Sequence, residues 1–254
     1  MIPTLHRVAA ALCIATAVCL APVQAQEAAK LDTAERDALR AEIRAYLLEN
    51  PEVLLEAMDI LEQRQTAAQA AADQQLLKDL APAILEDGRS WVGGNPEGDV
   101  TLVEFIDYRC GYCRKAHDEI AELIELDGDI RFIVKEFPIL GQGSLLSSRF
   151  AIATRLEAGD DAYKRAHDAL ITMRGEPSDE TLRNLAGMLG LDADAVMARM
   201  DDPEVVAELR ANRDLAEQLS IQGTPTFIVG DELVRGYVPL AQMQEIVLSQ
   251  RDEG

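Results

Sequence analysis

The chain has 254 residues, and its 45 acidic and 24 basic side chains give a formal charge of −21 at pH 7. Such a length suits one sizeable core with an appended segment. The acidic balance argues against nucleic acid and anionic membrane surfaces as partners, because both are negatively charged. The same balance favours solubility and says little about the fold.

Residues 1–25 predict a cleaved secretory signal peptide. Arg7 gives a positive start, and residues 8–20 form an apolar run that is too short to span a bilayer. Val23-Gln24-Ala25 has the small-residue pattern of a cleavage site, so we expect cleavage after Ala25. No later stretch is apolar enough to insert into a membrane, so we expect no membrane insertion of the mature chain.

Removal of that segment leaves two of the four cysteines, Cys110 and Cys113. An exported protein usually spreads cysteines along the chain as structural bridges. A bridge between residues this close restrains very little of the unfolded chain and would stabilise little. Redox or metal chemistry therefore explains the pair better than a structural role.

The segment that follows the signal predicts two short amphipathic helices. Asp32-x-x-Glu35 has the form of a capping box, and Asn50-Pro51 begins the second helix. Their apolar stripes contain Leu39, Ile43, Tyr46, Leu47, Val53, Leu54, Met58 and Leu61. Helices this short have no core of their own, so the stripe either binds copies of itself in an oligomer or folds back on the main domain. We assign residues 26–88 to an N-terminal helical oligomerisation region and linker, with self-association through residues 30–62.

Residues 89–254 predict an α/β domain. The expected order is a strand over 101–106, a helix over 111–126, a strand over 130–136, a helical insertion over about 140–220, strands over 226–229 and 232–235, and a helix over 240–250. A right-handed crossover would make the first two strands parallel. Gly230-Asp231 predicts a hairpin turn between the last two.

The cysteine pair lies where the first strand ends and its helix begins. The free N–H groups and positive end of a helix N-terminus favour the thiolate form of Cys110. Arg109, Arg114 and Lys115 add positive charge nearby in the sequence. Because the thiolate is the nucleophile in thiol chemistry, this position predicts a reactive Cys110.

These motifs resemble the DsbA-type branch of the thioredoxin superfamily over roughly residues 90–250. The motifs are Phe105-Ile106-Asp107-Tyr108-Arg109-Cys110-Gly111-Tyr112-Cys113 and Gly223-Thr224-Pro225-Thr226-Phe227. The N-terminal stretch, including Asn50-Pro51-Glu52-Val53-Leu54, resembles that of the suppressor-of-copper-sensitivity C proteins, some of which are trimeric disulfide isomerases. The resemblance implies a thioredoxin fold with an inserted helical block, a periplasmic location and a homotrimer.

The resemblance also implies residue roles. Cys110 matches the attacking cysteine, and Cys113 matches the buried resolving cysteine. Thr224 and Pro225 match the loop whose proline is cis and faces the disulfide. Thr224 is also expected to contact substrate.

Two charged residues behind the site complete the match. Glu104 matches a buried acid, and Lys135 on the next strand matches its usual partner. Such a pair would relay the proton that Cys113 gains or loses. The alternative interpretation of Glu104 and Lys135 is a strand-edge ion pair with no catalytic role.

Gly111 and Tyr112, the two residues between the cysteines, are expected to contact substrate. They replace the Pro-His of strong oxidases, so no histidine lies between the cysteines to stabilise the Cys110 thiolate. Together with Thr224 before the proline, this difference favours a less oxidising, isomerase-like protein.

The leading hypothesis is a periplasmic thiol–disulfide isomerase that acts on exported proteins with cysteines. It uses no cofactor beyond the Cys110–Cys113 dithiol and implies a membrane thiol reductase that keeps it reduced. One alternative is a DsbA-like dithiol oxidase. Another is a copper(I)-binding metal-tolerance protein in which the two thiolates hold the ion. A zinc site made of both cysteines, His117 and His167 is disfavoured, because His167 is distant in the sequence.

Overall fold

The computed structural model describes residues 32–253, and by its internal contacts the chain divides into residues 1–59 and 60–254. The predicted signal peptide and the cleavage site after Ala25 lie outside the described residues. Within residues 32–253, no helix is both long and apolar enough to cross a membrane.

The first unit contains α1 (Thr33–Glu49) and the beginning of α2 (Glu52–Asp79). The predicted capping box is present: the Glu35 N–H donates to Asp32, and the Asp32 N–H donates to Glu35. None of the α1 side chains is buried. The exposed apolar side chains of this unit are Leu39, Ile43, Tyr46, Leu48, Leu54, Leu55 and Met58. The predicted apolar stripe is thus present and exposed.

The second unit is built on a five-stranded sheet in the order β1-β3-β2-β4-β5. The strands are β1 (Trp91–Gly94), β2 (Val100–Ile106), β3 (Ile130–Glu136), β4 (Thr226–Val229) and β5 (Glu232–Arg235). β2 and β3 are parallel and β4 and β5 form an antiparallel hairpin, which confirms both predicted pairings. β1 was not predicted, because its two glycines resemble a turn.

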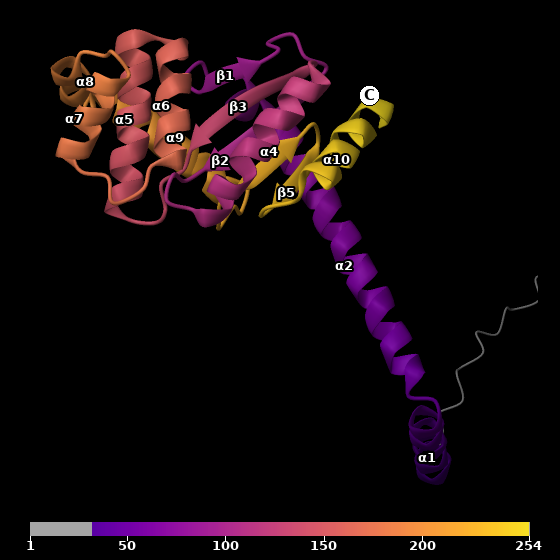
Figure 1. Cartoon of the computed structure of the whole chain (residues 1–254). Helices are drawn as coiled ribbons and strands as arrows, with labels where there is room; N and C mark the ends of the chain where they lie inside the picture. The colour runs from indigo at the N-terminus through magenta and orange to yellow at the C-terminus, as the bar shows by residue number, and fades with distance from the viewer. Residues whose placement is uncertain (1–31, 254) are drawn as a thin grey trace, which may run out of the picture. The chain divides into compact units, whose positions relative to one another are not determined.

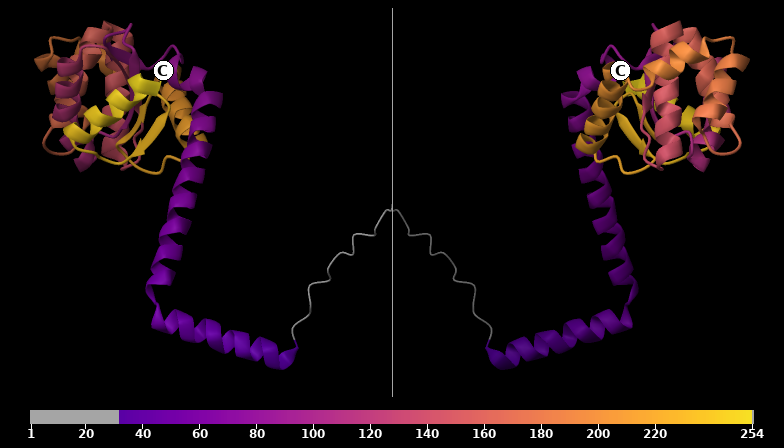
Figure 2. Two further views of the ribbon diagram at one scale, coloured as in Figure 1. Left: turned by 90° about the vertical axis from the view of Figure 1, so that its right-hand side faces the viewer. Right: turned by 90° about the vertical axis from the view of Figure 1, so that its left-hand side faces the viewer.

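Helices cover both faces of this sheet (Figures 1 and 2). On one face lie α4 (Gly111–Asp127) and α10 (Leu240–Glu253), which pack on the side of β2 that carries Leu102 and Ile106. On the other face lie α9 (Pro203–Gln218), α3 (Ala81–Leu85) and the end of α2, against Val103 and Phe105. Both faces of β2 are therefore covered and shielded from solvent, as its nearly continuous apolar sequence predicts.

The inserted helices α5 (Gln142–Ala158), α6 (Asp160–Thr172), α7 (Asp179–Met188) and α8 (Ala193–Arg199) gather beside the sheet (Figure 1). The Ser178 side chain caps α7 by accepting the Thr181 N–H. α5 begins at Gln142, and Ser144 in its first turn is buried. α8 was not predicted, although the Asp192 side chain caps it by accepting two backbone N–H bonds.

The second unit begins before residue 89, the predicted start of the α/β domain, because the end of α2 already belongs to it. Leu77 and Ile84 are buried in the core under β2. Arg235 donates to both carboxylate oxygens of Asp73, at 2.7 and 3.0 Å. The second unit thus includes residues 60–88, which were assigned to the N-terminal region and linker.

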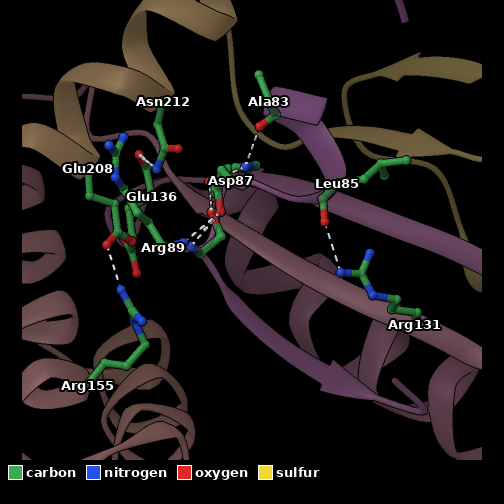
Figure 3. Close-up of polar contacts among 11 residues, drawn as sticks. Ala83, Leu85, Asp87, Arg89, Arg131, Glu136, Arg155, Glu208 and Asn212 are labelled. Carbon is green, nitrogen blue, oxygen red and sulfur yellow. Dashed lines mark hydrogen bonds and ion pairs between the residues drawn. The ribbon is translucent and has the colours of Figure 1, made fainter. Parts of the chain in front are cut away.

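The predicted pairing of Glu104 with Lys135 is wrong. In the parallel register Glu104 lies opposite Val134 and Lys135 lies opposite Phe105, so their side chains leave opposite faces of the sheet. The Lys135 Nζ donates instead to Asp87 at 2.5 Å and to the Ala83 carbonyl at 3.0 Å. Figure 3 shows these polar contacts and their neighbours, which we call the polar layer; it includes Ala83, Leu85, Asp87, Arg131, Glu136, Arg155, Glu208 and Asn212.

The same layer fixes α3 and its following turn onto the sheet (Figure 3). Arg131 donates to the Leu85 carbonyl at 2.9 Å, and Asn212 of α9 donates to the Glu136 carbonyl at 3.1 Å. Arg155 pairs with the buried Glu208 at 2.7 Å. These contacts hold α3 against the beginning of β3 and α9 against its end, and they join α5 to α9.

We expect Asp87→Ala to lower the free energy of unfolding by about 3–5 kcal/mol, because it leaves the fully buried Lys135 charge without its partner. Urea denaturation measures the loss. Asp194→Ala is the matched control, since Asp194 forms an exposed ion pair with Arg183 and should cost less than about 1 kcal/mol. Adding Lys135→Met to Asp87→Ala should recover part of the lost stability, because it removes the unpaired charge. Equal costs for Asp87→Ala and Asp194→Ala would contradict a structural role of the buried pair.

Candidate active site

The cysteine pair occupies the first turn of α4, at the C-terminal end of β2. Cys110 is the N-cap of α4, and its Sγ accepts the Cys113 N–H at 3.5 Å. Both are free thiols; the Cys110 residue is 7% exposed and Cys113 is fully buried. Only Cys110 therefore has a surface that another sulfur can approach.

The loop before β4 faces Cys110. The Cys110 thiol donates to the Thr224 carbonyl at 3.1 Å, and the Thr224–Pro225 peptide bond is cis, as the resemblance implied. A groove of about 510 Å³ runs past this loop and is lined by Gln69, Thr224, Pro225, Arg235 and Gly236, among others. The sequence pointed to Thr224 and Pro225, but not to the α2 residue on the other wall.

A buried acid lies beneath the dithiol. Burial raises the pKa of the Cys113 thiol well above its usual range, and the nearby Glu104 raises it further. Burial, followed by the charge of Glu136, raises the pKa of Glu104 to about 8. Its Oε1 has no hydrogen-bond partner among the described residues. Glu104 is thus a predominantly protonated carboxyl at neutral pH, placed close enough to Cys113 to affect its ionisation.

A second buried carboxyl, Glu136, has a full set of donors. Tyr108, Tyr163 and Ser148 each donate a hydroxyl hydrogen bond to it at 2.7 Å. Burial raises the pKa of Glu136 to about 7, although these bonds act in the opposite direction. Sequence reasoning missed this network, because its donors come from three separate elements.

Two histidines that are 50 positions apart in the sequence meet beside these acids. The rings of His117 on α4 and His167 on α6 have centroids 5.3 Å apart. Burial, followed by the charges of His117 and Lys164, lowers the pKa of His167 to about 3. The expectation that His167 is remote from the site is therefore wrong, because the insertion folds α6 back against α4.

Tyr112 forms an exposed aromatic surface next to Cys110. Its residue is 63% exposed, and its ring stacks on Tyr237 with centroids 6.1 Å apart. Tyr237 is held by its hydroxyl, which donates to Glu119 at 2.7 Å, and by Lys115 above its ring. A side chain added at Gly111 would meet nothing within 4 Å, so this side of Cys110 is sterically open.

The turn between β2 and α4 is set by Asp107, which sequence reasoning did not single out. Its carboxylate accepts the Arg109 N–H at 2.8 Å and the N–H groups of Ile139 and Leu140. An aspartate two residues before such a turn is the available sequence signal. Arg109 extends to Glu176, Arg114 donates to the Tyr108 carbonyl and Lys115 lies over the Tyr237 ring, so all three expected cations are engaged by other partners.

Together, the sheet, the cis-proline loop and the dithiol define a thioredoxin-fold protein with a Cys-x-x-Cys pair. The family model for the DSBA-like thioredoxin domain matches residues 101–247, so the chain belongs to that family of thiol–disulfide oxidoreductases. A second model, the N-terminal domain of the copper resistance protein ScsC, matches residues 35–68. The two predicted resemblances are confirmed.

Solved structures agree with this assignment. A thioredoxin-like oxidoreductase from Silicibacter pomeroyi is 39% identical, with 67% of this chain and 97% of that one covered and a TM-score of 0.64. The thiol–disulfide exchange protein α-DsbA2 of Wolbachia pipientis is 28% identical, with 72% and 97% covered and a TM-score of 0.67. Proteus mirabilis ScsC in a transitional conformation is 26% identical, with 88% and 100% covered and a TM-score of 0.65.

Among curated proteins, the Na⁺/H⁺ antiporter NhaA 3 of Salinispora tropica is 26% identical over 186 residues, which is 73% of this chain. The match covers 28% of that antiporter, and other NhaA antiporters match over similar shares. The chain thus spans about a quarter of the length of these relatives.

We expect Glu104→Gln to remove a pH dependence of stability. The folded protein holds the Glu104 proton up to about pH 8, whereas the unfolded chain releases it near its usual value of 4.5. The contribution of Glu104 to the free energy of unfolding is therefore most favourable below pH 4.5, and it decreases as the pH rises towards 8. The free energy of unfolding of Glu104→Gln, relative to that of the parent protein, should therefore increase by on the order of a few kcal/mol from pH 5 to pH 8.5. Urea denaturation at the two pH values measures this difference.

Glu122→Gln serves as the control for this comparison, because Glu122 is an exposed carboxyl on α4. It should follow the parent at both pH values. A Glu104→Gln variant whose stability runs parallel to the parent from pH 5 to 8.5 would show that Glu104 is ionised in the folded protein.

Proposed function

We propose that the chain is a periplasmic thiol–disulfide isomerase that rearranges wrong disulfides in exported proteins. The observation that carries the proposal is the division between the two sulfurs: Cys110 is accessible at the N-terminus of α4 beside the cis-proline loop, and Cys113 is fully buried behind it. Such a pair supplies one attacking sulfur and one that reacts only from within.

The reaction begins when the Cys110 thiolate attacks one sulfur of a substrate disulfide. The S–S bond breaks, Cys110 is joined to the substrate, and the released substrate sulfur leaves as a thiolate that takes up a proton. Another substrate thiolate then attacks the mixed disulfide, which forms the new bridge and restores Cys110. If no substrate thiol attacks, Cys113 does so, which releases a reduced substrate and an oxidised Cys110–Cys113 pair.

Substrate lies, in this proposal, in the groove along Thr224 and Pro225, with Gly111 and Tyr112 on the other side of Cys110. The groove and the exposed Tyr112 ring support this placement. The ionised fraction of Glu104, whose pKa is about 8, takes the proton that Cys113 loses when it attacks, because Glu104 is the buried carboxyl whose charge affects the Cys113 thiol. Lys135 has no place in this relay, since it faces the other side of the sheet.

The first unit supports isomerase over oxidase activity. Its exposed apolar stripe and its match to the ScsC N-terminal domain support a homo-oligomer, a trimer in this proposal, formed through residues 30–62. Several sites around one misfolded substrate favour repeated rearrangement. A membrane thiol reductase would keep the dithiol reduced in an oxidising compartment.

We expect the purified protein to reactivate a scrambled-disulfide substrate, and Cys110→Ser to abolish this activity because it removes the attacking sulfur. Cys113→Ser should retain part of the activity and accumulate mixed disulfide, since the internal escape route is lost. Recovery of substrate enzyme activity and thiol trapping by mass spectrometry measure the two effects.

The variant that combines Leu39→Asp and Ile43→Asp tests the oligomer in the same assay. It should lower the particle mass in light scattering and reduce reactivation severalfold, whereas Glu42→Asn on the same helix should change neither. Failure to reactivate, with rapid oxidation of a reduced substrate, would instead identify a dithiol oxidase. Inactivity in both assays, with copper(I) bound by the two thiols, would identify a metal-tolerance protein.

A further inference from the structure

A cavity of about 240 Å³ lies between α4, α6 and the sheet, behind the dithiol. Its wall is largely apolar, with Trp91, Ile120, Ile124 and Phe132. Five residues with ionisable side chains line it, and these are Glu104, His117, Glu125, Lys164 and His167. An apolar cavity with a few convergent polar groups is the usual form of a ligand site.

His117 and His167 of this cavity form a group of three potential metal ligands with Asp168, which does not line the cavity itself. His117, His167 and the neighbouring Asp168 each offer a donor atom, and these atoms lie within 4.8 Å of one another. They come from two helices, α4 and α6, which are packed together and fix the side chains in place. Movements of roughly 1 Å by His117 and Asp168 would bring all three to zinc distances of about 2.0–2.2 Å.

The hydrogen bonds of His167 present the nitrogen that such a site needs. Tyr108 donates its hydroxyl proton to Glu136 at 2.7 Å, so its oxygen accepts from His167 Nδ1, 3.1 Å away. This arrangement places the proton on Nδ1 and leaves the Nε2 lone pair free. Metal-binding histidines are oriented in the same way, by a hydrogen bond from the nitrogen that does not bind the ion.

Glu104 is the second, independent feature of the site. It lines the same cavity, it is 2% exposed, and its Oε1 has no hydrogen-bond partner among the described residues. An unsatisfied buried carboxyl oxygen is costly, and it is normally explained by an ion or a water molecule. Glu104, directly or through one water molecule, can complete the coordination that the other three begin.

We propose that His117, His167 and Asp168, with Glu104 behind them, form a site for a borderline divalent transition-metal ion of the Zn²⁺ type. Two imidazole nitrogens and a carboxylate oxygen suit such ions and not Mg²⁺, which prefers oxygen ligands alone. The site is separate from the dithiol and uses neither sulfur. A bound ion links α4, which carries the cysteines, to α6 of the insertion.

Lys164 is the competitor of the ion. Its Nζ contacts both carboxylate oxygens of Asp168, at 2.7 and 2.6 Å. Its side chain is 43% exposed, so it can turn into solvent when an ion arrives. Removing this ammonium group should therefore strengthen metal binding, because it frees the Asp168 carboxylate.

The test uses the protein with Cys110 and Cys113 oxidised to the disulfide, so that no thiolate can bind metal. Zn²⁺ affinity is measured by competition with a chromophoric chelator, and Co²⁺ absorption reports the ligands. We expect one ion per chain, visible Co²⁺ bands without sulfur-to-metal charge transfer, and a raised melting temperature with Zn²⁺ but not with Mg²⁺.

His117→Asn should weaken Zn²⁺ binding by more than about tenfold, since loss of even an outer-shell partner costs about 10–100-fold. Lys164→Met should strengthen it severalfold. Asp194→Asn, at another exposed aspartate paired with a basic side chain, should leave it unchanged. Unchanged affinity in His117→Asn, or no Zn²⁺ binding by the oxidised protein, would overturn the proposal whether or not the protein is an isomerase.

Discussion

The active site depends on the removal of Cys113 and Glu104 from water at the junction of β2 and α4. Cys113 is fully buried and Glu104 is 2% exposed, and neither gains a compensating cation. A buried thiol and a buried carboxyl are both more easily kept neutral than charged. The buried Cys113 thiol is therefore kept neutral, and Cys110 is the sulfur at the helix N-terminus that substrate can reach.

The sheet enforces this arrangement through its two-residue alternation. Glu104 and Glu136 lie on the face covered by α4, together with the tyrosines and histidines, whereas Lys135 lies on the face covered by α3 and α9. One face thus collects the buried carboxyls, tyrosines and histidines, and the other collects an ion pair that fastens the turn after α3 to the sheet. The sheet therefore separates Glu104 from the Lys135–Asp87 ion pair, because the two lie on its opposite faces.

The local motifs could be predicted from the sequence because each is encoded within a few residues. The capping box at Asp32, the strand-to-helix position of the cysteines and the parallel strands are confirmed. The cis Thr224–Pro225 bond is confirmed too, but it was expected from the family resemblance and not from the local sequence. The Glu104–Lys135 pair failed because a resemblance gives positions on a strand, while the register decides which face each side chain takes.

Contacts between distant segments could not be predicted. The meeting of His117 with His167, the three donors to Glu136 and the stacking of Tyr112 on Tyr237 all join residues whose spacing in the sequence carries no periodic pattern. They arise from the way the insertion and the C-terminal segment close over α4. The chemistry around the cysteines is thus specified by tertiary packing, and the cysteines themselves by a local motif.

The most direct test of this account is the rate at which each thiol of the reduced, folded protein is alkylated by iodoacetamide, located by mass spectrometry. The account predicts a single adduct on Cys110, with Cys113 labelled only after denaturation. Comparable rates at the two sulfurs, or faster labelling of Cys113, would contradict the division between an accessible attacking sulfur and a buried resolving one.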